Sequence, residues 1–173
     1  MGDSDLLPAR AGGVFPPVKD KILIAYVTKG GVTEEVANVI AGVLRDKYSF
    51  EVDIVNLKDN KSPNISQYRN VIVGYGVRMQ KVYGEALKFL ETDFKDKNVA
   101  VFVSSIEVGD PKGYEGAVQK YIKNTLEKYP HVKPVATEVF GGRISILGRT
   151  LIDKRDMTKV SAWAEELGKK LSS

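Results

Sequence analysis

The sequence contains no cysteine and a single histidine, His131, among its 173 residues. The lack of cysteine excludes disulfides, cysteine-ligated zinc, iron–sulfur clusters and thiol catalysis. One histidine cannot form a histidine cluster around a metal, so we expect no metal site. Any demanding chemistry must come from other side chains or from a bound cofactor.

Long hydrophobic runs and blocks of like charge are missing as well. No stretch approaches the ~20 apolar residues that span a bilayer, and the N-terminus lacks the pattern of a secretion signal. We therefore predict a cytoplasmic protein. The 26 Lys and Arg against 22 Asp and Glu give a formal charge of +4, which permits binding to anionic surfaces without requiring it.

The length and composition are typical of one globular domain with a substantial core, since 43% of the residues are hydrophobic and 28% are charged. Residues 1–20 contain three of the seven prolines and show no hydrophobic period. We predict a flexible leader over residues 1–20 and a single domain over residues 21–173.

From residue 21 onward, short apolar runs alternate with segments of helical period. The run over 21–27 has the pattern of a strand buried on both faces. From Thr33, the predicted helix cap, apolar residues recur every three or four positions. The same alternation predicts strands at 51–56, 70–75, 98–104 and 135–140, an irregular crossover at 57–70, and helices at 84–94, 111–129 and 158–171.

This alternation of strands and helices predicts an α/β fold, in which a parallel sheet is covered by helices on both faces. An open parallel sheet binds its ligand at the carboxyl ends of the strands, where the strand order reverses. The candidate site therefore consists of the loops 28–33, 74–83 and 104–113.

The first of these loops, Thr28-Lys29-Gly30-Gly31-Val32-Thr33, joins a buried strand to a helix and has no acidic residue. Its glycines let N–H groups converge, its hydroxyls add donors, and the helix dipole favours an anion. The loop predicts a phosphate cradle, and the alternative is an ordinary strand–helix turn. Neither the nucleoside-triphosphate motif GxxxxGK[ST] nor the dinucleotide motif GxGxxG follows the first strand.

The pattern Thr28-x-x-Gly31-x-Thr33-x-x-x-Ala37-x-x-Ile40, preceded by Tyr26, resembles the flavodoxin signature for the FMN phosphate loop. Ala25 departs from it, because a larger apolar residue is usual there. The resemblance covers about residues 21–171. It implies FMN as cofactor and a flavodoxin-like three-layer sandwich with a five-stranded parallel sheet of order 2-1-3-4-5. The phosphate contacts that it implies are Thr28, Lys29, Gly30, Gly31, Val32 and Thr33.

Among flavodoxin-like proteins, the chain is most similar to the branch that includes menaquinone-dependent protoporphyrinogen oxidases. In those oxidases a longer basic and apolar segment follows the motif Phe-x-Gly-Arg. Here only residues 144–157 separate Arg143 from the final helix. The features that carry this similarity are Gly74-x-Gly76-Val77-Arg78-Met79, Val103-Ser104-Ser105, Phe140-Gly141-Gly142-Arg143 and the helix around Trp163.

By the same resemblance, the flavin ring lies between the second and third loops. Gly76 and Val77 are expected to offer backbone N–H and C=O groups to its edge. Neither loop contains a tryptophan, so Met79, Tyr83 or Tyr114 would flank the ring. Packing in the core is the alternative role of both tyrosines.

Arg78 is the most informative charge, because a guanidinium beside the flavin stabilises its anionic reduced form and raises the potential. The alternative is a solvated arginine that pairs with Glu107 or Asp110, and Asp110 is also expected to cap the helix that starts at Pro111. Glu107 is a candidate acceptor for flavin N3–H. The other cofactor contacts expected in the third loop are Ser105, Ile106 and Gly109.

Two functions stay open. One is an FMN-binding, flavodoxin-type redox protein that transfers electrons between partners; the other is an FMN-dependent oxidase or dehydrogenase of the protoporphyrinogen oxidase type with a quinone acceptor. We expect a redox partner protein or a small redox substrate, no nucleic acid, and at most peripheral membrane contact. A solvated surface, or docking of an acidic redox partner, porphyrin propionates or anionic lipid, would explain the basic cluster Arg143, Arg149, Lys154 and Arg155.

Overall fold

The computed structural model describes residues 18–173. A parallel sheet lies at its centre. Its strand order is β2-β1-β3-β5-β6, which confirms the predicted α/β fold and the order 2-1-3-4-5. The short β4 (Lys81–Val82) pairs antiparallel with the end of β3. The parallel strands are β1 (Val18–Val27), β2 (Glu51–Asn56), β3 (Tyr68–Arg78), β5 (Asn98–Ser105) and β6 (Ala136–Gly141).

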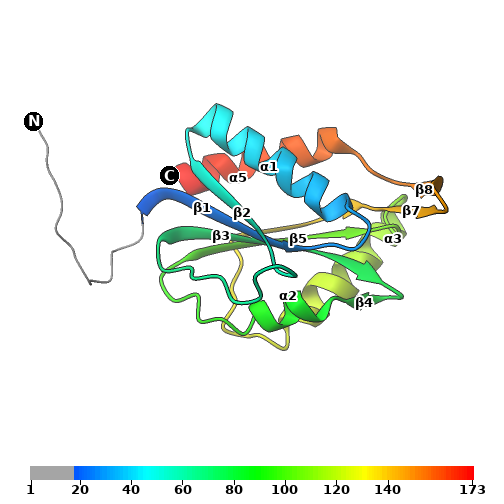
Figure 1. Ribbon diagram of the computed structural model, residues 1–173, viewed down its shortest axis with the longest axis horizontal. Coiled ribbons are helices and arrows are strands. Elements are labelled where there is room, and N and C mark those ends of the chain that lie inside the picture. Colours follow the sequence, from blue (N-terminus) through cyan, green and yellow to red (C-terminus); the bar gives the residue numbers. More distant parts are fainter. Residues whose placement is uncertain (1–17) are drawn as a thin grey trace, which may run out of the picture.

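Helices cover both faces of the sheet and complete a three-layer sandwich (Figure 1). The helices α1 (Val32–Tyr48) and α5 (Met157–Ser172) pack on one face. On the other face lie α2 (Gly84–Phe89) and a continuous helical segment. That segment consists of α3 (Pro111–Ala117), the π-helical stretch η2 (Val118–Lys123) and α4 (Asn124–Leu126).

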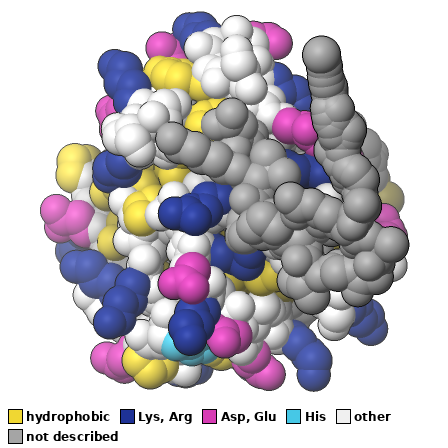
Figure 2. All heavy atoms as spheres, turned by 90° about the vertical axis from the view of Figure 1, so that its left-hand side faces the viewer, with side chains coloured by type: hydrophobic (Ala, Val, Ile, Leu, Met, Phe, Trp, Pro, Cys, Tyr) yellow, Lys and Arg dark blue, Asp and Glu magenta, His cyan; other side chains and the backbone are white. Residues whose placement is uncertain are grey.

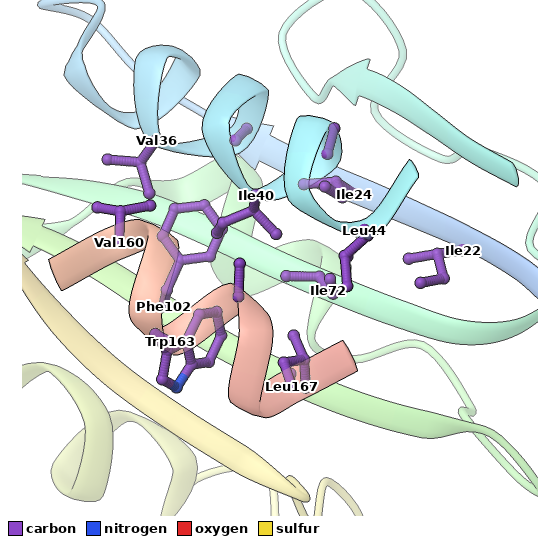
Figure 3. Close-up of a cluster of buried hydrophobic side chains, with 14 of the residues drawn as sticks. Ile22, Ile24, Val36, Ile40, Leu44, Ile72, Phe102, Val160, Trp163 and Leu167 are labelled. Carbon is purple, nitrogen blue, oxygen red and sulfur yellow. The ribbon is translucent and has the colours of Figure 1, made fainter. Parts of the chain in front are cut away.

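The core is divided by the sheet into two layers, as strand alternation requires. Ile22 and Ile24 of β1 point into the layer beneath α1 and α5, whereas Ala25 and Val27 point into the layer beneath α2 and η2. In the first layer Trp163 of α5 lies against Phe102, with ring centroids 6.3 Å apart (Figure 3). Strand β1 is therefore buried on both faces, as its apolar run predicts.

Several predicted boundaries are wrong. Strand β1 begins at Val18, inside the expected leader, whose remaining residues 1–17 lie outside the described part of the chain. Strand β3 takes up the end of the expected crossover and continues to Arg78. The helix predicted at 84–94 ends at Phe89, because the chain turns so that Phe94 packs edge-on against that ring at 5.6 Å.

A hairpin that the hydrophobic period did not predict stands at the carboxyl edge of the sheet. It comprises β7 (Arg143–Ile146) and β8 (Arg149–Asp153), which pair antiparallel. Its turn has Leu147 at φ 52° and Gly148 at φ 78°, two consecutive left-handed residues as in a type I′ turn. Leucine is a rare residue there, so the usual turn signal was missing. In Figure 1 the hairpin lies at the right-hand end, beyond α3.

The end of the molecule opposite the hairpin has charges of both signs on its surface. Figure 2 views the left-hand end of Figure 1, where Lys and Arg side chains intermingle with Asp and Glu. Within residues 18–173, no helix has the length and apolar character needed to span a bilayer.

Candidate functional site

A cleft of about 420 Å³ opens at the carboxyl edge of the sheet. Strand order reverses between β1 and β3, so the cleft lies at the position where open α/β sheets bind ligands. Twelve of the fourteen predicted cofactor contacts line it: Thr28, Lys29, Gly30, Val32, Thr33, Gly76, Val77, Arg78, Met79, Ser105, Ile106 and Glu107. The cleft is completed by Gln80, Tyr83, Ser104, Gly142, Arg143 and Ile144.

The loop after β1 turns sharply at Gly31, whose φ is +84°. Thr28 Oγ1 accepts a hydrogen bond from Gly31 N at 3.0 Å and fixes this turn. Helix α1 therefore begins at Val32, with Gly31 as N-cap and no side chain bonded to the first-turn amides. Such amides, at the positive end of a helix dipole, are suited to an anion.

The predicted cap role of Thr33 is wrong. Thr33 lies one residue inside α1 and is almost fully buried, because the left-handed Gly31 starts the helix earlier than the hydroxyl pattern predicts. A Cβ added to Gly76 would lie 3.3 Å from Thr33 Oγ1 and equally close to the ring of Tyr83. The first two loops thus meet closely at Gly76, and a larger residue there would crowd both side chains.

Tyr83 is one of the two tyrosines predicted to flank a flavin, and it lines the cleft. Lys29 Nζ lies 5.0 Å from its ring centroid, within the range of a cation–π contact. Burial raises the pKa of the Tyr83 phenol, so the side chain stays protonated and neutral. The side chain is a partly buried, uncharged wall of the cleft.

Tyr114 and Gly109 do not line this cleft. They border a neighbouring hollow of about 340 Å³ together with Lys154. The Tyr114 hydroxyl donates to Glu138 Oε1 at 2.5 Å, so the packing alternative holds for Tyr114. Asp110 caps α3 by accepting from Gly113 N at 2.8 Å, as predicted. Gly109 directly precedes this cap and lies beside the neighbouring hollow.

Ser104 lies at the end of β5 and lines the cleft, although its side chain is only 6% exposed. Its Oγ has no hydrogen-bond partner within residues 18–173. A buried hydroxyl without a partner costs about 1–3 kcal/mol. A polar group of a ligand that reaches this wall of the cleft would remove that cost. Ser104 belongs to the motif that carried the resemblance, but it was not among the predicted contacts.

Glu107 is held by the neighbouring π-helical stretch. Its carboxylate accepts from Lys120 Nζ at 2.9 Å and from the Tyr121 hydroxyl, both on η2. Burial opposes ionisation of Glu107, but the hydrogen bonds from Tyr121 and Lys120 outweigh burial, so its pKa lies below the ordinary value. Stretches of π-helix are frequent at functional sites, and this one fixes an ionised acid in the wall of the cleft.

Arg78 is exposed at the mouth of the cleft. Its predicted alternative pairing is wrong, because Glu107 is taken by Lys120 and Tyr121 and Asp110 caps α3. Arg78 forms no ion pair with any residue of the described chain, so its charge faces the opening.

Arg143 connects the hairpin to the phosphate loop. Its Nη2 donates to Gly30 O at 3.3 Å and to Glu35 Oε2 at 3.2 Å. Arg155 Nη1 donates to the other oxygen of Glu35 at 2.8 Å. The motif Phe140-Gly141-Gly142-Arg143 pointed to this segment, but its contact with the cleft depends on the hairpin and was missed.

The described part of the chain holds no group of three or more His, Cys, Asp or Glu residues that suits a metal ion. What the fold and the cleft define is an α/β protein with an anion site at a helix N-terminus and a partly apolar slot beside it. A family model described as "Flavodoxin domain" matches residues 23–170. The chain therefore belongs to the flavodoxin domain family.

Solved structures share this fold. Flavodoxin 2 from Bacillus cereus is 23% identical with a TM-score of 0.61, over 87% of this chain and 99% of that one. Flavodoxin 1 from the same organism is 22% identical with a TM-score of 0.59, over 86% and 97% of the chains. A Fusobacterium nucleatum flavodoxin mutant bound to flavin mononucleotide is 18% identical with a TM-score of 0.53, over 87% and 96%. A search of the curated proteins gave no match.

FMN is the cofactor of this family, and the protein is a flavoprotein of the flavodoxin type. The cleft fits FMN for two reasons that hold within residues 18–173. No side chain there caps the start of α1, which suits a phosphate, and none bonds the Ser104 hydroxyl, which suits a polar group of a ligand. Nothing in these comparisons supports the protoporphyrinogen oxidase branch or the alternative function with a quinone acceptor.

Proposed function

We propose that the protein is an electron carrier, which holds FMN in the cleft and transfers electrons between partner molecules. The observation that carries this proposal is the composition of the cleft. Among the lining residues within 18–173, Glu107 is the single acid and no histidine or cysteine accompanies it. Its carboxylate already accepts from two donors. The cleft thus offers places for a cofactor but no free general base for a substrate.

FMN supplies one- and two-electron chemistry when bound. In the proposed arrangement, the backbone amides of Lys29, Gly30, Val32 and Thr33 bind its phosphate together with the hydroxyls of Thr28 and Thr33. Lys29 adds positive charge nearby, while Gly31 shapes the loop without lining the cleft. The peptide groups of Gly76 and Val77, with Ser105 and Ile106 on the other side, position the ring system.

Side chains at the mouth of the cleft tune the bound cofactor in this proposal. Arg78 carries a positive charge there that no acid within residues 18–173 pairs, and such a charge favours the reduced, more anionic state of a flavin. Met79, the next residue, is 87% exposed. This side of the cleft therefore leaves the cofactor accessible to a partner. Gly109 has no place in the proposal, because it borders the other hollow.

The experiment that tests the carrier function is a comparison of stoichiometric transfer with turnover. Holoprotein reduced anaerobically and separated from its reductant should deliver its electrons once to ferricyanide. It should not accelerate oxidation of protoporphyrinogen by a menaquinone analogue above the rate without protein. Sustained turnover of that substrate would overturn the proposal in favour of an enzyme. The identity of the natural partners and a cytoplasmic location stay predictions.

A further inference from the structure

The hairpin formed by β7 and β8 exposes apolar side chains. Within the described chain, six large hydrophobic side chains are exposed, and four of them lie here: Ile146, Leu147, Leu151 and Ile152. Leu147, in the turn, is 96% exposed. Single exposed apolar residues are normal on a monomer, but several gathered on one short element indicate an interaction site.

This apolar surface continues into the cofactor cleft. Ile144 lines the cleft, and the exposed Ile146 follows two residues later on the same strand, β7. Ile152 of β8 is the direct cross-strand partner of Ile144. Met79 reaches the same opening from the loop between β3 and β4. A partner that covers the hairpin therefore comes to lie over the opening of the cleft.

The hairpin is anchored rather than free. Arg143 and Arg155 both bind Glu35 in the first turn of α1. Lys154 N donates to Gly142 O at 2.8 Å, and the Lys154 carbonyl packs where a Cβ on Gly141 would be. A surface that is already ordered costs little conformational entropy when it binds a partner.

The charge around this surface is positive. Arg149 of the hairpin and Lys154 after it form no ion pair with the described chain, and the same holds for Arg78 and Lys81 at the mouth of the cleft. The nearby acids Glu35 and Asp153 are neutralised by Arg143 and Arg155. Charge complementarity therefore favours an acidic partner.

The size of the surface limits the kind of complex. The hairpin comprises residues 143–153, whereas a stable interface uses about 20–30 residues a side. A lasting dimer of this chain would need more surface than these residues provide. Electron-transfer encounters occupy the small end of the range of interface sizes.

We propose that the β7–β8 hairpin docks a small acidic electron-transfer protein, with Ile146, Leu147 and Leu151 in the apolar centre of the contact and Arg149 at its rim. This inference rests on the proposed carrier function, because it identifies where that carrier meets one of its partners. Docking there covers the opening of the cleft and shortens the path to the cofactor.

The test is equilibrium binding of an acidic plant-type [2Fe–2S] ferredoxin to the FMN-loaded protein, measured by titration calorimetry at low salt, with basic cytochrome c as the probe of opposite charge. Wild type should bind the ferredoxin and not the cytochrome. The double variant Leu147→Ser/Leu151→Ser, and separately Arg149→Glu, should weaken ferredoxin binding at least tenfold. Added salt should weaken binding to the wild type.

Matched control variants come from the amino-terminal ends of the strands, opposite the cleft. Val135 is also an exposed apolar residue, just before β6, and Lys95 is an exposed cation before β5. Val135→Ser and Lys95→Glu should change ferredoxin binding less than twofold. Equal losses in controls and hairpin variants, or no binding to wild type, would overturn the proposal.

Two further outcomes would also overturn it. One is a wild-type dimer in light scattering that the hairpin variants abolish. The other is binding of wild type to phosphatidylglycerol vesicles that the hairpin variants lose, while ferredoxin binding stays unchanged. FMN affinity, measured in parallel by fluorescence quenching, separates the two proposals. A protein that does not bind FMN defeats the carrier function, whereas intact FMN binding without ferredoxin binding defeats the docking site alone.

Discussion

Ser104 has a buried side-chain hydroxyl that no group within residues 18–173 hydrogen-bonds. Its Oγ lines the cleft. We expect Ser104→Ala to raise the stability of the apoprotein by about 1 kcal/mol, because an unsatisfied hydroxyl is removed. The same change should weaken FMN binding about tenfold, the effect of losing roughly one hydrogen bond.

Urea denaturation of the apoprotein and FMN titration measure these two effects separately. Ser105→Ala is the control, because Ser105 Oγ already accepts from Glu107 N at 3.1 Å, and its loss should not stabilise the apoprotein. If Ser104→Ala lowers apoprotein stability and leaves FMN affinity unchanged, the hydroxyl does not bind the cofactor.

Gly31 and Gly30 form a matched pair within the phosphate loop. Neither position would bring an added Cβ within 4 Å of another atom, but Gly31 alone has a φ in the left-handed region, at +84°. Gly31→Ala should therefore destabilise the apoprotein by about 1 kcal/mol through backbone strain. Gly30→Ala should stay within about 0.5 kcal/mol. Urea denaturation measures both, and equal losses would contradict the conformational role of Gly31.

Glu107 gives a prediction in pH. Its folded pKa is below the ordinary value despite burial, because Tyr121 and Lys120 bind its ionised form. A carboxyl group whose pKa is lowered by folding stabilises the folded state above its unfolded pKa of about 4.3. This stabilisation is lost as the pH falls through the folded pKa. Glu107→Gln should therefore lower the melting temperature at pH 7, and the difference from wild type should shrink below about pH 4.

The exposed Glu115 on α3 is the control, because its side chain forms no hydrogen bond or ion pair within residues 18–173. Glu115→Gln should leave the melting temperature unchanged at both pH values. A Glu107→Gln deficit that stayed constant from pH 7 to pH 3 would show that its ionisation is not involved.

Sequence predicted most of the residues that line the cleft, because they lie directly after strands whose apolar runs are easy to recognise. The phosphate loop follows the buried strand β1, and its glycines and hydroxyls point to an anion without further knowledge. The cap role of Thr33 was mispredicted, since a left-handed Gly31 can start a helix without a hydroxyl. Ser104 was missed because an unpartnered hydroxyl is a property of the folded chain.

At the scale of elements, Glu35 joins the first turn of α1 to the hairpin through Arg143 and Arg155. Glu35→Gln should increase hydrogen exchange of the amides in residues 143–153 several-fold. The free energy of unfolding should change by less than about 1 kcal/mol, because ion pairs near the surface contribute little to stability. Exchange measured by mass spectrometry and urea denaturation give the two quantities.

Glu34→Gln is the control for this change, because Glu34 occupies the same helical turn but forms no ion pair with the hairpin. It should leave the exchange of residues 143–153 unchanged. If both variants increase that exchange equally, the effect belongs to the charge at the start of α1 and not to the anchoring of the hairpin.

The elements that sequence did not predict share a physical cause. The β7–β8 strands are short, their turn uses Leu147 and Gly148, and their stability comes from contacts with α1 that are distant in sequence. The helix predicted at 84–94 looked longer than α2 because Phe94 continues the apolar pattern, although its ring packs on Phe89 from a turn. Local patterns cannot distinguish such tertiary packing from a continuing helix.

At the scale of the whole molecule, the alternation of strands and helices predicted a parallel sheet covered on both faces, because right-handed crossovers leave few arrangements. The strand order came from the resemblance to flavodoxins. The sheet then fixes where chemistry can occur. Three loops, drawn from residues 28–33, 74–83 and 104–113, meet at the carboxyl ends of the strands. The opposite end of the molecule has intermingled charges (Figure 2). Part of the positive charge behind the formal +4 lies at the cleft, since Lys29 and Arg78 line it and neither forms an ion pair within residues 18–173.

The account is tested most directly by titrating the apoprotein with FMN and with riboflavin, which lacks the phosphate, and following flavin fluorescence. We expect one FMN to bind per chain and riboflavin to bind at least a hundredfold more weakly, because the amides of the α1 N-terminus and the loop after β1 have no phosphate to bind in riboflavin. Equal affinities, or no quenching by either flavin, would contradict the assignment of this cleft as the FMN site.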